Sequence, residues 1–111
     1  DLEIIEEERL VENAATVGDH LLMRLRELEA QHSFVTAARG RGLMCAFDLP
    51  GTAMRDAVRK RCFDTGILIL GCGRHSLRFR PPLTITNEEI DAGLEVLVDA
   101  MSHVHRHGPD A

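Results

Sequence analysis

Two arginines separated by one residue, Arg78 and Arg80, are the side chains of this sequence best suited to bind an anion. They alternate with the apolar residues Leu77 and Phe79, which is the period-two pattern of a strand with one buried face. On such a strand both guanidinium groups leave the same face. A guanidinium binds a carboxylate through two parallel N–H···O bonds and stays charged near neutral pH. The pattern by itself is typical of a solvated sheet face or of a salt bridge to a helix, and the alternative is a carboxylate site.

Two glycine-rich segments are similar to nucleotide-binding and RNA-binding motifs. Gly71-Cys72-Gly73 follows the apolar run Ile67–Leu70 but precedes a strand instead of a helix, and it lacks a third glycine. We therefore expect a tight turn there and no dinucleotide loop. Residues 39–42, Arg-Gly-Arg-Gly, are similar to half of an RNA-binding repeat, but the chain has no aromatic rings interleaved with them. We expect a flexible joint between two strands, with Arg39 and Arg41 structural.

No metal site is expected from the histidines. His103, His105 and His107 alternate near the end of the sequence, and residues two apart on a helix point in nearly opposite directions. We expect these three side chains to lie on a solvated helix end that frays from His105 onward.

The cysteines do not form a paired motif. Cys45 and Cys62 fall on predicted apolar faces, where cysteine usually acts as a small core residue. Cys72 falls in the predicted turn, and no neighbouring residue in the sequence supplies a base to activate it. An odd number of cysteines with no C-x-x-C pair argues against disulfides and zinc, and it favours a reducing, cytoplasmic location.

Length and composition limit the class of protein. The 111 residues are enough for one domain, 1–111, with one modest core. The net charge of −5 and the absence of Trp and Tyr disfavour nucleic-acid binding. No apolar run approaches the roughly 20 residues of a membrane-spanning helix, so no membrane partner is expected. The sequence begins with Asp1 and not Met, so we expect a piece of a longer protein.

Hydrophobic periodicity gives the order of elements. A helical face runs through residues 11–28, and the wholly polar residues 6–9 predict a break or bend that divides residues 1–31 into two helices in series. Gly18 lies within that apolar face, which predicts a close contact. Two strands at 35–38 and 43–49, a helix from Thr52 to about Gly66, and two strands at 67–70 and 76–80 follow.

The last predicted element is a helix with an N-terminal capping box formed by Thr86 and Glu89. Its apolar positions predict a buried face. These positions are Ile90, Leu94, Leu97, Met101 and Val104. The whole order predicts an α+β fold, a three- to four-stranded antiparallel or mixed sheet with helices packed on one face.

Three short segments have amino-acid sequences that are specific for a known family. Residues 39–48, RGRGLMCAFD, are followed about 30 residues later by Leu70-Gly71-Cys72-Gly73 and by residues 76–81, SLRFRP. In this order they resemble the C-terminal small domain of class III pyridoxal-phosphate aminotransferases, which have fold type I. The resemblance covers nearly the whole chain.

The resemblance implies the chemistry and the partners of the intact protein. It implies transfer of the 6-amino group of L-lysine to 2-oxoglutarate, or alternatively transamination of 4-aminobutyrate or another ω-amino acid, in a homodimer. Pyridoxal 5'-phosphate would be held by a lysine of a large domain upstream. By the family motif, Arg78 would bind the substrate carboxylate, and a large-domain glutamate would pair with it between substrates. No role is implied for Arg80.

The same resemblance predicts that this segment contains no catalytic, cofactor-binding or metal-binding residue. Its only lysine, Lys60, lies between Arg59 and Arg61 on a polar helix face, whereas a lysine that binds a carbonyl needs a site that lowers its pKa. The segment alone is therefore expected to be inactive. The alternative from another class is a stand-alone α+β module that binds or regulates through a ligand.

Overall fold

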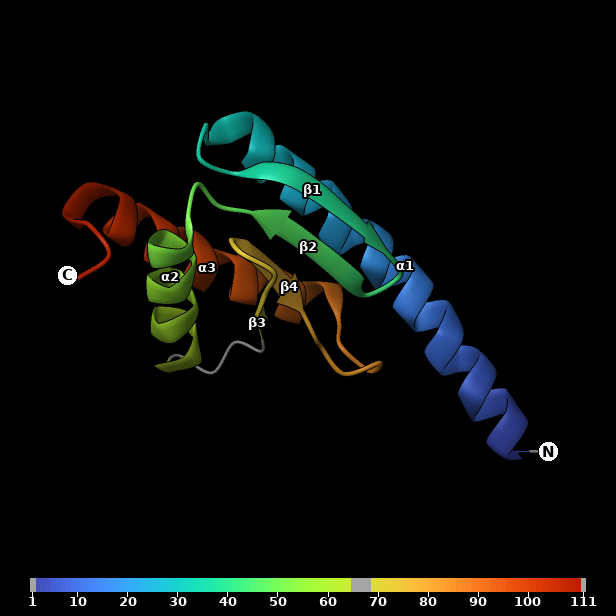
Figure 1. The fold of residues 1–111 in the computed structure, drawn as a ribbon. Coiled ribbons are helices and arrows are strands. Elements are labelled where there is room, and N and C mark those ends of the chain that lie inside the picture. Colours follow the sequence, from blue (N-terminus) through green and yellow to red (C-terminus); the bar gives the residue numbers. More distant parts are fainter. Residues whose placement is uncertain (1, 65–68, 111) are drawn as a thin grey trace.

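The computed structural model describes the backbone of residues 2–64 and 69–110 and the side chains of residues 6–63 and 73–110. Figure 1 shows the elements in chain order. They are α1 (Leu2–Gln31), β1 (Thr36–Arg41), β2 (Met44–Asp48), α2 (Thr52–Asp64), β3 (Ile69–Cys72), β4 (Ser76–Phe79) and α3 (Asn87–His107).

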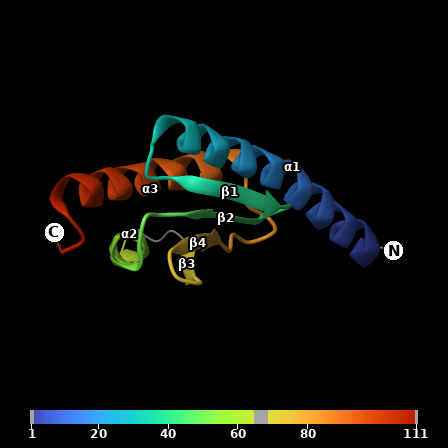
Figure 2. The same cartoon turned by 45° about the horizontal axis from the view of Figure 1, so that its top comes forward.

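The four strands form one antiparallel sheet in the order β1-β2-β4-β3. Helices α1 and α3 cover one face of this sheet, and α2 packs against α3 beside β3 (Figure 2). Within the described part of the chain, no helix covers the other face, which we call the open face. The predicted α+β architecture is confirmed, and the sheet is wholly antiparallel.

The core lies between the covered face and the two long helices. Cys45, Phe47 and Leu77 project into it from β2 and β4 and are at most 1% exposed. From the helices, residues of the predicted apolar faces meet them. These are Leu21, Leu25 and Leu28 of α1 and Ile90, Leu94, Leu97, Met101 and Val104 of α3. Alternation therefore places the intervening residues of β2 and β4 on the open face.

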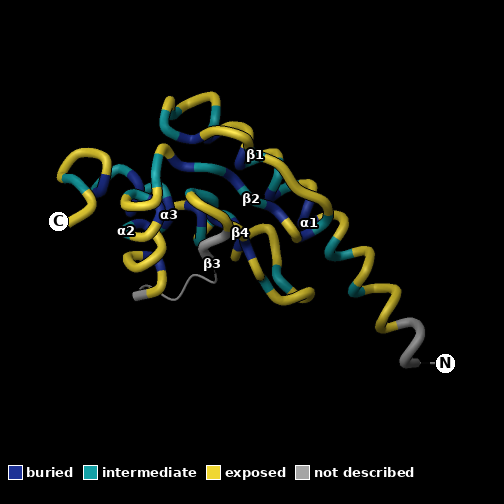
Figure 3. Tube along the Cα trace, viewed as in Figure 1, coloured by how far each residue is buried: buried dark blue, intermediate teal, exposed yellow. Residues whose placement is uncertain are grey.

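The predicted break in the first helix is wrong, because α1 is continuous from Leu2 to Gln31. Residues 6–9 are all exposed, and Val11 is 68% exposed (Figure 3). A helical segment that projects beyond the core needs no apolar face. Glutamate and arginine are good helix formers and continue the helix without one. The missing apolar period therefore marks the edge of the core and not the end of the helix.

The expected close contact at Gly18 is confirmed. A Cβ atom built on Gly18 would lie 2.2 Å from the carbonyl carbon and oxygen of Gly42. Gly42 lies in the turn between β1 and β2 and has a φ angle of +57°, a conformation that favours glycine. The β1–β2 turn thus rests directly on the backbone of α1.

Polar contacts tie α1 to the segments that follow β4. The Asn13 side chain donates to the backbone carbonyls of Leu83 at 2.7 Å and Ile85 at 3.0 Å. Arg24 Nη1 lies 2.6 Å from Asp91 Oδ1 on α3, and His20 Nε2 lies 2.7 Å from the same oxygen. These contacts hold the segment after β4 in place at one end of the sheet.

The predicted loop at residues 39–42 is largely wrong. Arg39 pairs with Ala46 and Arg41 with Met44, so β1 extends to Arg41 and only the residues around Gly42 form the turn. Backbone pairing with β2 satisfies the hydrogen bonds of this glycine-containing segment, which outweighs the low strand propensity of glycine.

The third strand extends further along the chain than predicted. Gly71 and Cys72 belong to β3, and the turn occupies residues 73–75. Helix α2 begins at Thr52 as predicted, and the Thr52 hydroxyl donates to the Arg74 carbonyl at 2.6 Å. The predicted helix end at Gly66 and the predicted strand start at residue 67 lie outside the described residues.

Helix α3 begins as predicted and ends later than predicted. Thr86 and Glu89 form a complete capping box. Fraying from His105 is not observed, since α3 continues to His107 and Gly108 caps it. The His105 ring stacks on Phe34 with centroids 4.5 Å apart, and basic residues favour the negative end of the helix dipole. No helix in the described part of the chain is both long enough and apolar enough to cross a membrane.

The Gly18 contact yields a stability prediction. Within a helix, alanine is favoured over glycine by about 1 kcal/mol, so Gly18→Ala can destabilise only through the clash with Gly42. We expect a net loss of about 1–3 kcal/mol in the free energy of unfolding, as for other overpacked sites. Urea unfolding followed by circular dichroism measures it. Thr16→Ala, at an exposed position of the same helix, is the control and should not destabilise. Equal stability of the two variants would contradict the contact.

Candidate functional site

The candidate site lies on the open face, where β2 runs between β1 and β4. Ala46 pairs with Arg39 on one side and with Arg78 on the other. The three side chains therefore form one row across the sheet, with the small methyl group of Ala46 between two guanidinium groups. The predicted alternation of β4 is confirmed, because Arg78 and Arg80 are exposed while Leu77 and Phe79 are buried.

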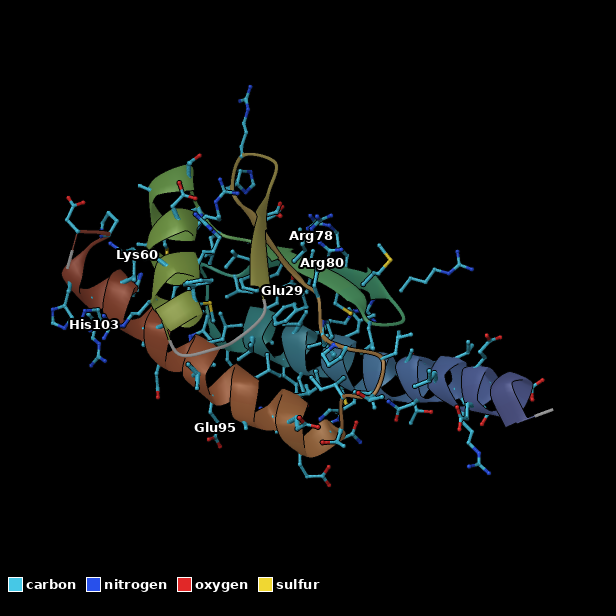
Figure 4. The ribbon with its side chains drawn as sticks, turned by 90° about the horizontal axis from the view of Figure 1, so that it is seen from below. Glu29, Lys60, Arg78, Arg80, Glu95 and His103 are labelled. Carbon is cyan, nitrogen blue, oxygen red and sulfur yellow. The ribbon has the colours of Figure 1, made fainter. Side chains whose placement is uncertain are left out.

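An open groove of about 750 Å³ runs along this row. Its lining includes Ala46 of the open face, the covered-face residues Cys45 and Phe79 and the segment Pro81–Leu83, and Arg39, Arg78 and Arg80 contribute its cationic groups. Figure 4 shows the Arg78 and Arg80 side chains near one another beside the sheet. A mostly apolar groove with a few convergent charged groups is typical of a site for a small organic anion.

The guanidinium groups of Arg78 and Arg80 are both available to a ligand in this groove, and Arg78 is the one carried by a strand. Across residues 6–63 and 73–110, Arg78 takes part in no ion pair or side-chain hydrogen bond. Its strand is paired on both sides, with β2 and with β3, so the backbone that carries it is a rigid mount. An exposed, unpaired guanidinium on a central strand keeps both N–H pairs free for an incoming carboxylate.

Arg39, in contrast, is engaged by its neighbours. Its Nη1 donates to Asp48 Oδ1 at 3.0 Å and to the Ala37 carbonyl at 2.8 Å, and its Nη2 donates to Ser76 Oγ at 3.2 Å. The Ser76 hydroxyl in turn donates a short hydrogen bond to Asp48 Oδ1. These residues form a closed polar network beside the groove, and the expectation that Arg39 is structural agrees with it.

The network determines the charge state of Asp48. Burial alone would raise the pKa of this carboxyl, but the hydrogen bonds from Ser76 and Arg39 and the nearby charges of Arg39 and His75 outweigh it and lower the pKa. Asp48 is therefore ionised at neutral pH and is already paired.

Sequence reasoning did not identify Asp48 as part of the site. The alternation of buried Cys45, Phe47 and Leu49 indicated that Asp48 shares the face of Ala46. Its pairing with Ser76 and its approach to Arg39 depend on the order of the strands, which the sequence left open.

The residues of this chain do not fit a Schiff-base site for pyridoxal phosphate. Lys60, its only lysine, is exposed on α2 between the exposed residues Arg59 and Arg61. Figure 4 shows Lys60 on α2, apart from Arg78 and Arg80. A lysine that forms a carbonyl adduct is activated by a dehydrated environment, and an exposed helix face does not provide one.

The structure offers no metal site or reactive thiol in its described part. No group of three or more His, Cys, Asp or Glu side chains among these residues is arranged to hold a metal ion. His103 and His107 lie one helical turn apart with ring centroids at 4.7 Å, whereas His105 packs on Phe34. Cys45 and Cys62 are buried as predicted, neither is in a disulfide within the described part of the chain, and burial raises the pKa of each thiol to about 11. The Cys72 side chain is outside the described residues.

The Asp48 network predicts a specific pH dependence of stability. A carboxyl whose pKa is lowered on folding stabilises the fold above its unfolded pKa, about 3.9, and that stability is lost as the pH falls through the folded value. Asp48→Asn removes this contribution. We therefore expect the melting temperature of Asp48→Asn to be below that of the wild type at pH 6, and the difference to shrink toward pH 3. Thermal unfolding across this range measures it.

Glu12→Gln is the matched control, because Glu12 is an exposed carboxylate on α1 outside the network. The difference between its melting temperature and that of the wild type should be small throughout the same range. A difference for Asp48→Asn that stays constant from pH 6 to pH 3 would show that the carboxylate charge does not contribute.

Comparison with known proteins places the chain in a family. The model of the aminotransferase class-III family matches residues 1–101. The L-lysine-epsilon aminotransferase of Amycolatopsis lactamdurans is 48% identical over 104 residues, which is 91% of this chain and 23% of that protein. The mitochondrial 4-aminobutyrate aminotransferase of Mus musculus is 38% identical over 96 residues, 86% of this chain and 19% of that protein.

A solved structure agrees with the sequence relatives. The lysine aminotransferase from M. tuberculosis in the internal aldimine form superposes with a TM-score of 0.86 at 44% identity, over 93% of this chain and 24% of that one. The chain thus spans less than a quarter of the length of these relatives. Class-III aminotransferases depend on pyridoxal phosphate. With the α+β fold, the paired motifs and the family model in agreement, the chain belongs to the class-III aminotransferase family.

Proposed function

We propose that the intact protein is a homodimeric ω-aminotransferase of the cytoplasm and that this chain is its C-terminal small domain. Its reaction would move the 6-amino group of L-lysine to 2-oxoglutarate. Membership of the class-III family supports the reaction type. The 48% identity to an L-lysine-epsilon aminotransferase supports lysine as the amino donor.

The observation that carries the role of this chain in the reaction is the free guanidinium of Arg78 in the groove. Both amino acids and keto acids present a carboxylate, and a fixed arginine fork orients it. By binding this carboxylate, Arg78 would hold the substrate at one end so that its other end meets the cofactor. Positioning of this kind lowers the entropic part of the barrier. The chemistry at the amino group would then occur on a large domain that is not in this chain.

The open face is the surface on which we place that large domain. Met44 is 79% exposed and Leu83 is 51% exposed at the groove. Exposed apolar side chains beside a polar site are typical of a surface that another domain covers. Closure over the groove would exclude water and strengthen the pairing of Arg78 with a carboxylate.

Transamination of 4-aminobutyrate is the second candidate, because a 4-aminobutyrate aminotransferase is 38% identical over most of this chain. The two candidates differ in the amino donor. Initial rates of the intact enzyme with 2-oxoglutarate and either L-lysine or 4-aminobutyrate separate them. We expect a higher kcat/KM with L-lysine, and a preference for 4-aminobutyrate would reverse the assignment.

The role of Arg78 makes a quantitative prediction for the intact enzyme. Arg78→Ala removes a charge-assisted bidentate pair worth about 1.5–3 kcal/mol. The KM for 2-oxoglutarate should therefore rise roughly 10- to 150-fold. Arg78→Lys should restore only part of this loss, because an ammonium group is a point charge and cannot reproduce the planar fork. Steady-state kinetics with 2-oxoglutarate and with a neutral aldehyde acceptor measure both effects.

Two arginines serve as controls for this experiment. Arg41→Ala removes the same charge from the open face outside the groove, and it should leave the KM for 2-oxoglutarate nearly unchanged. Arg80→Ala removes the guanidinium just after β4 and should affect folding or closure more than selectivity for the keto acid. An equal loss of activity with the keto acid and the aldehyde in Arg78→Ala would make Arg78 structural.

A further inference from the structure

Asp48 occupies a symmetrical position between two arginines on the open face. It lies two residues beyond Ala46 on β2, and Ala46 pairs with both Arg39 and Arg78. Each arginine is therefore a diagonal neighbour of Asp48, one on each adjacent strand. Diagonal neighbours lie about 7–8 Å apart at Cα, which is within reach of a long side chain. Either guanidinium could pair with this carboxylate.

The structure shows that Arg39 takes the carboxylate. Arg39 Nη1 lies 3.0 Å from Asp48 Oδ1, while Arg78 makes no ion pair with any residue in the described part of the chain. Ser76, which is directly opposite Asp48 on β4, completes the arrangement by donating to Asp48 and accepting from Arg39. The carboxylate is thereby held on the β1 side.

An irregularity in β1 explains why Arg39 is in place. Ala37 has a φ angle of +53°, a left-handed conformation that is disfavoured for alanine, and the β1–β2 register shifts between Thr36 and Arg39. The bulge turns the Ala37 carbonyl toward Arg39 Nη1, which donates to it at 2.8 Å. Glu29 of α1 accepts from the Ala38 N–H at 2.8 Å and so secures the bulge from the helix side.

We propose that Arg39 is a positioning residue for substrate binding, because it sequesters Asp48 and so keeps Arg78 free for the substrate carboxylate. Without Arg39, Arg78 is the arginine that remains diagonal to Asp48 on an adjacent strand. The substrate would then compete with a carboxylate of the protein itself for the same fork. This inference rests on the proposed role of Arg78 in binding the substrate, and it adds a residue that acts only through Asp48.

The test uses the intact enzyme and glutarate, an unreactive dicarboxylate that competes with 2-oxoglutarate. We expect Arg39→Ala to raise the inhibition constant of glutarate and the KM for 2-oxoglutarate roughly three- to tenfold, the size of coupling found within one charged network. The KM for a neutral aldehyde acceptor should not change. The double variant Arg39→Ala/Asp48→Asn should recover most of the loss, because no competing carboxylate remains.

Two controls distinguish sequestration from other effects. Arg41→Ala removes a positive charge from the same face without changing a partner of Asp48. A similar rise in the inhibition constant of glutarate for Arg41→Ala would show that any loss of positive charge on this face weakens binding, and it would overturn the proposal. Arg39→Gln keeps a donor for Ser76 and Ala37 but lacks the charge, and it serves if Arg39→Ala does not fold. In a crystal structure of the folded variant, Arg78 should lie within hydrogen-bond distance of Asp48.

The outcomes also separate this inference from the proposed function. If Arg78→Ala does not weaken glutarate binding, the proposed role of Arg78 is wrong, and the role of Arg39 falls with it. If Arg78→Ala weakens binding but Arg39→Ala does not, or if the double variant fails to recover, only the sequestration by Arg39 is wrong. A loss in kcat with all acceptors and no change in KM would make Arg39 a purely structural residue.

Discussion

The pairing of Phe47 with Leu77 in the core determines where the functional groups of this domain lie. Both side chains are fully buried under α1 and α3, and they lie opposite one another on the central strands β2 and β4. A slip of one residue would expose both and bury a guanidinium, so hydrophobic burial fixes the register strongly. The next pair along the strands, Ala46 and Arg78, is therefore directed to the open face. The core thus aims the arginine without contacting it.

On the open face, some charged side chains are paired with one another and others are left available to a ligand. Arg39, Asp48 and Ser76 satisfy one another, and the bulge at Ala37 holds this arrangement on the β1 side. Arg78 is left with a small alanine as its neighbour and a mostly apolar groove beside it. A mostly apolar groove with a guanidinium mounted on a central strand suits a ligand with a carboxylate and an aliphatic chain, which is the chemistry of ω-amino acids and of 2-oxoglutarate. The site therefore uses one paired arginine to keep another one available.

Local patterns in the sequence predicted the covered face, the capping box at Thr86 and the outward direction of Arg78, because period and cap chemistry depend on near neighbours. The long helix α1 was misjudged because residues 6–9 have no apolar face, yet good helix formers continue a helix beyond the core without one. The Arg39 network was not predicted in any detail, because Arg39 is 9 positions from Asp48 and 37 positions from Ser76 in the sequence. The strand order β1-β2-β4 and the strained residue Ala37 bring these side chains together. Such contacts depend on which strands pair in the folded chain, and single-residue propensities carry little information about that pairing.

The central claim is that Arg78 receives the substrate carboxylate while Arg39 remains on Asp48. A crystal structure of the intact protein with bound glutarate tests it most directly. The account predicts one glutarate carboxylate in bidentate contact with the Arg78 guanidinium, at N···O distances of about 2.7–2.9 Å, with the Arg39–Asp48–Ser76 network unchanged. Glutarate bound to Arg39 or Arg80 with Arg78 turned away, or Asp48 paired with Arg78 beside the bound ligand, would contradict it.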